Sequence, residues 1–289
     1  MRTSFRLGIV QLCARQDVEE NLRAVATGVH DAAEGGADFV LLPENLAYMG
    51  PEAGKLAMAE PVGTGPISAA LASLARRAHV YLAAGGIPEC AREVGKVHNT
   101  FVVFAPNGDV CATYRKIHLF DIHIPEAIDI LESSTVAPGC DPVVLSTPLA
   151  TFGLSICYDL RFPELYRKLA LAGAEVMLVP AAFTAHTGRD HWHVLLRARA
   201  IENTCYVAAA GQFGQHMPGR VSYGRSAVVD PWGRVLAEAP DGELSTVVVT
   251  IDLERLRAVR RGMPSLQHIR CNSVSPDAVL VCQSKDNQP

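Results

Sequence analysis

The stretch Phe152-Gly-Leu-Ser-Ile-Cys157-Tyr-Asp-Leu-Arg161-Phe-Pro163-Glu-Leu decides how this chain of 289 residues is interpreted. Its apolar half, residues 152–156, is typical of a buried strand. Pro163 suits the first turn of a helix, where a residue without an N–H costs no hydrogen bond. The stretch therefore predicts a strand followed by a helix, with Cys157 in the turn between them.

A cysteine in such a turn lies close to backbone N–H groups that have no partner within the helix. Those groups lower the pKa of a thiol and donate hydrogen bonds to the oxyanion that forms when the sulfur attacks a carbonyl. We therefore interpret Cys157 as a candidate nucleophile. The alternative is that the sulfur only fills space in the core, as an isolated cysteine more often does.

Short apolar strands alternate with alanine-rich helical segments, which predicts an α/β fold with helices packed over mixed sheets. A hairpin is expected where residues 100–104 and 110–114 flank Pro106-Asn-Gly-Asp. No linker divides the chain, so residues 1–270 are expected to form one domain, and the polar segment 271–289 a loose C-terminal tail. The remaining strands are expected at 6–11, 39–42, 80–85, 175–179, 205–211, 226–230, 234–238 and 246–251, and the helices at 17–34, 66–77, 163–172, 190–201 and 253–261.

Composition and charge argue against several classes of function. The formal net charge is −4 and no cluster of Lys and Arg stands out, which argues against a nucleic-acid-binding protein. No apolar stretch is long enough to span a membrane. The eight cysteines include no C-x-x-C pair and the first residues do not fit a secretory signal, so reduced thiols and a cytoplasmic location are expected.

Two charged residues follow other predicted strands and are candidate partners of the cysteine. Glu44 comes after the apolar run 39–42, and Lys116 comes after the run 110–114. In an open α/β sheet, ligand sites form at the ends of such strands. A cysteine nucleophile needs a base, and its tetrahedral intermediate needs a positive partner. Each residue alone is more often an ordinary loop charge, so the interpretation depends on the three occurring together.

The three segments together resemble the carbon–nitrogen hydrolases of the nitrilase superfamily. The matching sequences are Leu-Leu-Pro-Glu44-Asn, Tyr-Arg-Lys116-Ile-His-Leu-Phe-Asp and Ile-Cys157-Tyr-Asp-Leu-Arg161-Phe-Pro-Glu, and the resemblance covers about residues 5–270. It implies a Glu–Lys–Cys triad, a second glutamate at Glu132, and a four-layer α-β-β-α sandwich. It also implies a homodimer or a higher homo-oligomer whose chains pair through helices.

Later segments resemble the Nit branch of that superfamily, most closely the deaminated glutathione amidases and slightly less the ω-amidases. These segments are His191-Trp192-His193, Arg197-Ala-Arg199-Ala-Ile-Glu202, Ser222-Tyr223-Gly-Arg225-Ser and Val-Val-Asp230-Pro-Trp232-Gly. His193 stands where the closest relatives have an acidic residue, and Arg225 where they have His, which puts the substrate preference in doubt. The segment 212–220 varies in such enzymes, so its contacts are not predictable.

The resemblance implies hydrolysis of a small-molecule amide through a thioester on Cys157, without a cofactor or a metal ion. Glu44 would move the protons. Lys116 and the backbone N–H of Tyr158 would stabilise the oxyanion. Glu132 would position Lys116 or the substrate.

A 2-oxo-acid amide with an anionic end would need a cationic contact. Arg161, four residues after the nucleophile, is a candidate for binding the carboxylate; the alternative is that it pairs within the following helix. Phe183 and Thr184, after the strand expected at 175–179, are candidate walls of the pocket.

Nearby histidines suggest two other kinds of site. His186, His191 and His193 could suggest a metal site, but the last two lie two residues apart on a predicted helix and do not share a face. His118 and His123 follow the lysine segment and could suggest a Cys–His thiol enzyme.

Several activities fit the same triad. An ω-amidase and an N-carbamoyl amino acid amidohydrolase are the alternatives among hydrolases. An acyl transferase would use the same thioester with an amine in place of water. A non-catalytic binding protein on the same fold is the fourth possibility, and the intact triad argues against it.

Overall fold

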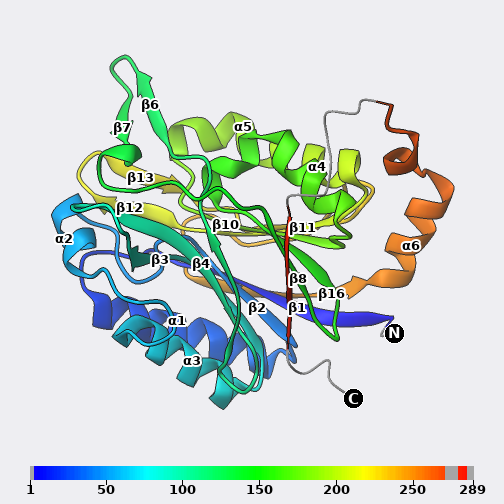
Figure 1. Cartoon of the computed structure of the whole chain (residues 1–289), viewed down its shortest axis with the longest axis horizontal. Coiled ribbons are helices and arrows are strands. Elements are labelled where there is room, and N and C mark those ends of the chain that lie inside the picture. Colours follow the sequence, from blue (N-terminus) through cyan, green and yellow to red (C-terminus); the bar gives the residue numbers. More distant parts are fainter. Residues whose placement is uncertain (1–2, 271–278, 285–289) are drawn as a thin grey trace.

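The computed structural model describes residues 3–270 and 279–284, which form four layers (Figure 1). Two large β-sheets lie face to face in the middle of the molecule, and helices cover the outer face of each. The expected α-β-β-α sandwich is therefore confirmed. Within the described residues, no helix is both long and apolar enough to cross a membrane.

The first sheet is built on the parallel strands β1, β2 and β3, which antiparallel strands extend on both sides. In spatial order its strands are β16 (Ser245–Asp252), β1 (Ser4–Gln11), β2 (Phe39–Leu42), β3 (Tyr81–Cys90), β4 (Val97–Phe104) and β5 (Val110–Arg115). Helices α1 (Val18–Glu34) and α3 (Pro66–Ala78) bury an apolar face against this sheet. The Asp17 carboxylate caps α1 by accepting a hydrogen bond from the Glu20 N–H at 2.9 Å.

The second sheet has parallel strands β9, β10 and β11 at its centre. In spatial order its strands are β15 (Val235–Glu238), β14 (Ala227–Val229), β11 (Tyr206–Gly211), β10 (Val176–Ala181), β9 (Thr151–Leu154), β8 (Val143–Ser146) and β17 (Leu280–Gln283). Helices α4 (Pro163–Leu171) and α5 (Ala185–Asn203) cover its outer face, and α6 (Leu253–Gly262) follows β16.

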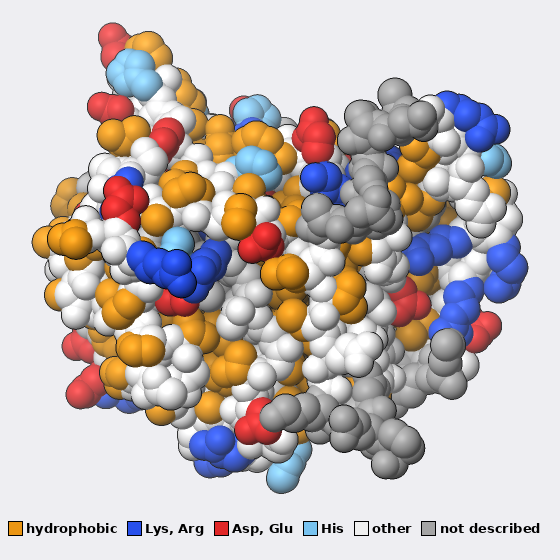
Figure 2. Space-filling model, in the orientation of Figure 1, with side chains coloured by type: hydrophobic (Ala, Val, Ile, Leu, Met, Phe, Trp, Pro, Cys, Tyr) orange, Lys and Arg blue, Asp and Glu red, His pale blue; other side chains and the backbone are white. Residues whose placement is uncertain are grey.

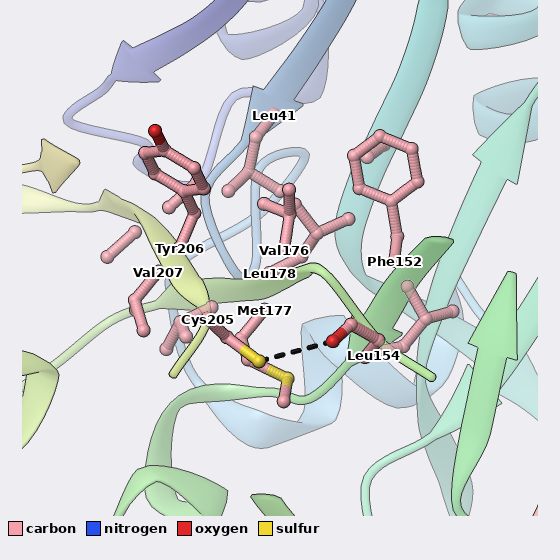
Figure 3. Close-up of a cluster of buried hydrophobic side chains, with 14 of the residues drawn as sticks. Leu41, Phe152, Leu154, Val176, Met177, Leu178, Cys205, Tyr206 and Val207 are labelled. Atoms are coloured by element: carbon pink, nitrogen blue, oxygen red, sulfur yellow. Dashed lines mark hydrogen bonds between the residues drawn. The ribbon is translucent and has the colours of Figure 1, made fainter. Parts of the chain in front are cut away.

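The core between the sheets joins side chains from both inner faces. The rings of Phe39 in the first sheet and Phe152 in the second stack with their centroids 4.2 Å apart. Figure 3 shows part of this cluster, with Leu41 from the first sheet and Val176 and Leu178 from the second. This packing fixes the two sheets relative to one another, so their strand ends are rigid supports for a site.

Several elements lie outside the expectations from the sequence. They are α2 (Glu52–Ala57), the strand β8, the hairpin of β6 (Asp121–Ile124) and β7 (Ile128–Leu131), the hairpin of β12 (Phe213–Met217) and β13 (Arg220–Tyr223), and three 3₁₀ turns at Glu132–Ser134, Cys157–Arg161 and Ser265–His268. The β6–β7 hairpin stands out from the rest of the surface (Figures 1 and 2). Helix α5 begins at Ala185 and not at residue 190.

Part of the C-terminal tail belongs to the second sheet. Residues 280–283 form β17, which pairs in parallel with β8, and the Ser284 N–H donates to the Ser146 carbonyl at 3.1 Å. The expectation of a loose segment is wrong for these residues, because β17 satisfies backbone groups that the edge of β8 would otherwise expose. The rest of the expected tail lies outside the described residues.

Three strand ends bring the candidate residues to one region. β2 ends at Leu42, just before Glu44, and β5 ends at Arg115, directly before Lys116. β9 ends at Leu154, shortly before Cys157. The first two strands belong to one sheet and the third to the other, so the site lies where the two sheets meet.

Candidate active site

Cys157 lies in the turn between β9 and α4, as the sequence predicts. It is the first residue of a 3₁₀ turn, and α4 begins six residues later at Pro163. Its φ of +47° lies in the left-handed region, which costs a residue with a side chain roughly 1–3 kcal/mol. Because only 7% of the residue is exposed, the surrounding core holds this strained conformation in place.

The thiol does not have the lowered pKa that its place in the turn suggests. Burial raises the pKa of Cys157 well above its ordinary value, and the charge of Glu44 raises it further. Lys116 and the backbone of Ala182 lower the pKa but do not outweigh burial. The resting sulfur is therefore a neutral thiol, and it needs a base before it attacks.

Lys116 is buried between two carboxylates. Its Nζ lies 3.0 Å from Glu44 Oε1 and 2.8 Å from Glu132 Oε2, and 2% of its side chain is exposed. Burial alone would lower the pKa of the ammonium, but the charges of Glu132 and Glu44 outweigh burial and raise the pKa well above its ordinary value. Burial would likewise raise the pKa of Glu132, but Lys116 outweighs it and lowers that pKa. Lys116 and Glu132 are therefore both charged at neutral pH.

Asn99, on β4, holds the two glutamates and is absent from the residues predicted from sequence. Its Nδ2 donates to Glu44 Oε1 at 2.9 Å and to Glu132 Oε1 at 3.3 Å. The other oxygen of Glu44, Oε2, accepts a hydrogen bond from the Ala182 N–H at 2.8 Å. No sequence signal marks Asn99, because its neighbours in the strand, His98 and Thr100, are polar as well. These contacts fix the Glu44 carboxylate beside Lys116.

Asp159 is the second residue absent from the sequence predictions. It is fully buried, and its Oδ2 accepts hydrogen bonds from the Tyr114 hydroxyl at 2.6 Å and the Ile156 N–H at 2.8 Å. Its Oδ1 accepts from the His118 N–H at 3.1 Å and lies 2.7 Å from Nδ1 of the same residue. Tyr114 and His118 flank Lys116, and Ile156 directly precedes Cys157. One carboxylate thus ties the strand end of the lysine to the turn of the cysteine.

Two cavities meet at Cys157. The larger has a volume of about 280 Å³, and its lining includes Cys157, Glu44, Lys116 and Glu132. The smaller is lined by Cys157 together with Tyr158, Phe183, Thr184 and Thr187. Phe120 and Ala182 line both. The structure therefore brings all the sequence-predicted site residues except Arg161 to the walls of these two cavities.

Arg161 lies behind the wall of the smaller cavity. Its guanidinium carbon lies 5.0 Å from the centre of the Phe183 ring and 5.7 Å from that of Tyr158, and its Nη1 lies 3.1 Å from His191 Nδ1. Burial lowers the pKa of Arg161 from its ordinary value. Among the described residues no carboxylate forms an ion pair with it, so the alternative of pairing within the following helix is not what the structure shows.

His193 and Arg225 both contact Glu238 and line neither cavity. His193 Nε2 lies 3.3 Å from Glu238 Oε2. His118, held by Asp159, also lines neither cavity, and His123 is largely exposed on β6. Over residues 3–270 and 279–284, no group of three or more His, Cys, Asp or Glu is arranged to hold a metal ion.

The chain is similar to known proteins over most of its length. Residues 6–261 match the model of the family described as carbon-nitrogen hydrolase. A Synechocystis sp. (strain PCC 6803) protein named deaminated glutathione amidase is 46% identical over 262 residues, which make up 90% of this chain and 96% of that protein.

Solved structures extend the similarity to the fold. The C. elegans NitFhit protein superposes with a TM-score of 0.84 at 36% identity; the match covers 93% of this chain and 66% of that chain, so this chain spans about two thirds of NitFhit. A mutant of the amidase from Nesterenkonia sp. AN1, with acrylamide added at its active-site cysteine, superposes with a TM-score of 0.75 at 28% identity, over 90% of this chain and 98% of that chain. With a family model matched over most of its length and a relative 46% identical, this chain is an amidase that belongs to the carbon–nitrogen hydrolases of the nitrilase superfamily.

Proposed function

We propose that Cys157 is the nucleophile of this amidase, with Glu44 as its base and Lys116 as the cation that stabilises the oxyanion. The observation that supports this assignment is that the three residues and Glu132 line one cavity of about 280 Å³. The neutral state of the buried thiol requires a base, and Glu44 is the carboxylate that interacts with it.

In the proposed reaction, Glu44 removes the thiol proton as the sulfur attacks the amide carbon. Lys116 and the backbone N–H of Tyr158 stabilise the tetrahedral oxyanion, and one such donor is typically worth roughly 3–4 kcal/mol. The C–N bond breaks when Glu44 returns the proton to the leaving nitrogen, which leaves a thioester on Cys157. Glu44 then removes a proton from water as the water attacks the thioester carbon, and it returns that proton to the sulfur when the C–S bond breaks, so the carboxylic acid leaves and the Cys157 thiol is restored. Glu132 keeps Lys116 charged and in position.

The proposed substrate is deaminated glutathione, which the similar Synechocystis protein is named for. This molecule is a 2-oxo-acid amide with a carboxylate at its acyl end. Arg161 has no acidic partner among the described residues and stacks on Phe183, so it is the proposed partner of that carboxylate, beside the smaller cavity that Phe183 and Thr184 line.

A release assay tests the assignment of substrate. Wild-type enzyme should release product from deaminated glutathione faster than from α-ketoglutaramate, the ω-amidase substrate, or from an N-carbamoyl amino acid. A tenfold preference for α-ketoglutaramate would instead favour the ω-amidase alternative. Hydroxylamine distinguishes a transferase, because an enzyme that prefers amines over water accumulates hydroxamate.

Cys157→Ala tests the nucleophile. The variant should lose turnover, whereas Cys140→Ala, which removes an exposed thiol, is the matched control. Intact-mass analysis of wild-type enzyme during turnover should reveal an acyl adduct on Cys157. Undiminished activity of Cys157→Ala would eliminate the proposed mechanism.

We further propose a homodimer that pairs through α5 and the β14–β15 turn. Val194, Ile201 and Trp232 lie on these elements with 66%, 43% and 52% of their surfaces exposed, and exposed apolar side chains of this size favour an interface. Light scattering that gives the 31.0 kDa mass of one chain would refute it.

The domain assignment and the location of the protein are also proposals. One domain over residues 1–270 is supported by a core that runs continuously from β1 to α6. A cytoplasmic location is supported by the chemistry of the site, because a thiol nucleophile works only while it is reduced. Limited proteolysis and localisation of a tagged protein would test these two proposals.

A further inference from the structure

The larger cavity carries two cations that the proposed mechanism does not use. Lys55 on α2 and Arg220 on β13 both line its wall, on elements far apart in the sequence. Both contact Glu52: Lys55 Nζ lies 2.8 Å from Oε2, and Arg220 Nη1 lies 3.7 Å from Oε1. Figure 1 shows α2 and the β12–β13 hairpin at the same end of the molecule. We call Lys55 and Arg220 the cation pair.

The cation pair has capacity for a further anion. Two positive charges share the one carboxylate of Glu52, which also accepts a hydrogen bond from the Thr135 hydroxyl at 2.7 Å. An ammonium has three N–H donors and a guanidinium has five, so most donors of the pair are not committed to Glu52. The side chains of Lys55 and Arg220 are 14% and 29% exposed, so water only partly screens their attraction to a bound anion.

Of the acids that line this cavity, only Glu52 forms an ion pair with either cation among the described residues. Glu44 and Glu132 are both bound to Lys116, although the charge of Lys55 also acts on Glu132 and lowers its pKa. Asp129 is on the exposed β6–β7 hairpin, with 85% of its side chain exposed and His123 at 3.5 Å. An anion at the cation pair would therefore contact two cations and the carboxylate of Glu52, with Glu132 beyond direct contact.

The position of Glu44 indicates which part of the substrate enters this cavity. Glu44 lines the larger cavity and not the smaller one, and in the proposed reaction it gives its proton to the leaving nitrogen. The leaving amine therefore lies in the larger cavity, on the side of Glu44. In deaminated glutathione the leaving amine is a dipeptide that ends in a carboxylate.

We propose that Lys55 and Arg220 form a binding site for the terminal carboxylate of the leaving amine. The inference rests on the proposed function, and it extends that function by assigning the residues that distinguish a peptide-like leaving group from ammonia. The planar guanidinium of Arg220 fits a carboxylate in a two-point contact, and Lys55 adds a point charge.

The test compares deaminated glutathione with the same molecule amidated at its C-terminal carboxyl group. For the wild type, kcat/KM for the acid should exceed that for the carboxamide by about tenfold, the effect of one charge-assisted contact. The ratio should fall by about threefold or more in Lys55→Met and in Arg220→Met, and to near unity in the double variant. Lys55→Arg should retain the ratio. Arg23→Met removes an exposed cation on α1 and is the control.

Each result separates the two proposals. A wild-type ratio near unity, or variants that lose activity equally on the acid and the carboxamide, would overturn the carboxylate site and leave the amidase mechanism standing. Wild-type enzyme that hydrolyses neither compound, nor α-ketoglutaramate, would overturn the proposed substrate itself. The comparison of the two substrates on wild-type enzyme requires no folded variant.

Discussion

The substitution Asp159→Asn tests whether one carboxylate holds the lysine strand and the cysteine turn together. The change is almost isosteric, and it replaces one oxygen by an NH₂ group. Oδ2 of Asp159 accepts hydrogen bonds from the Tyr114 hydroxyl and the Ile156 N–H, and Oδ1 accepts from the His118 N–H and lies beside Nδ1 of the same residue. Whichever way the new amide turns, its NH₂ group faces one backbone N–H, of Ile156 or of His118, from which it cannot accept a hydrogen bond.

The expected magnitude follows from this geometry. One hydrogen bond from a backbone N–H to a charged acceptor is lost, at roughly 1.5–3 kcal/mol, so we expect the free energy of unfolding to fall by about 1.5–3 kcal/mol. At about 2–4 °C for each kcal/mol, that corresponds to a melting temperature lower by roughly 3–12 °C. The cysteine turn is no longer fixed to the lysine strand, and a displacement of about 1 Å costs roughly a hundredfold in rate.

Two measurements check this expectation. Thermal unfolding followed by circular dichroism gives the change in melting temperature, and kcat is measured well below the melting temperature of the variant. Asp241→Asn, at an exposed turn, is the control for the chemical change alone. A variant with wild-type kcat and a melting temperature within about 2 °C of wild type would refute the argument, because at least one charged hydrogen bond would have to be worth almost nothing.

Three further changes probe the site. Lys116→Met leaves the two carboxylates beside it uncompensated and should lower the free energy of unfolding by about 3–5 kcal/mol in urea titrations; a loss below about 1 kcal/mol would contradict the buried cluster. The pKa of Glu132 is lowered on folding, so the stability it contributes is complete above its unfolded pKa of 4.5 and is lost as pH falls through the lower folded pKa. The free energy of unfolding of the wild type should therefore exceed that of Glu132→Gln by an amount that decreases as the pH falls from about 7 to about 3. A difference in free energy that stays constant over this range would argue against the ion pair. Gly86→Ala places a Cβ 2.4 Å from the Asn45 N atom at a residue whose φ is +76°, and it should reduce kcat about tenfold or more. Gly95→Ala is the control in the same kinetic assay: its φ is similar but its Cβ would meet nothing within 4 Å, so it measures the effect of the backbone conformation without a clash.

The layers of the fold could be predicted because their helices and strands have clear local sequence patterns, and the packing of the folded protein favours the same elements. The turn Pro106-Asn-Gly-Asp predicts its hairpin, and Asp17 and Pro66 mark the first turns of their helices. The β6–β7 hairpin was not predicted, because its turn has Glu126 at a φ of +61° in place of the usual Asn or Gly. The first turns of α5 contain Gly188, a poor helix former that is required there because a Cβ would lie 2.5 Å from Tyr223.

The residues of the candidate site could be predicted where a short sequence segment is enough to identify them. Glu44, Lys116 and Cys157 each follow a strand, and the structure places them around one cavity. Asn99 and Asp159 act through long-range hydrogen bonds that no local pattern reveals. The predicted lowering of the Cys157 pKa was wrong for a related reason. The pKa is raised by burial, and burial depends on how the two sheets pack together and not on the turn itself.

The neutral resting state of Cys157 has a consequence for how long the enzyme survives. Peroxide and alkylating reagents consume thiolates far faster than thiols, so a protonated sulfur resists oxidation between turnovers. The burial that raises the pKa of the Cys157 thiol therefore also protects its sulfur from these reagents.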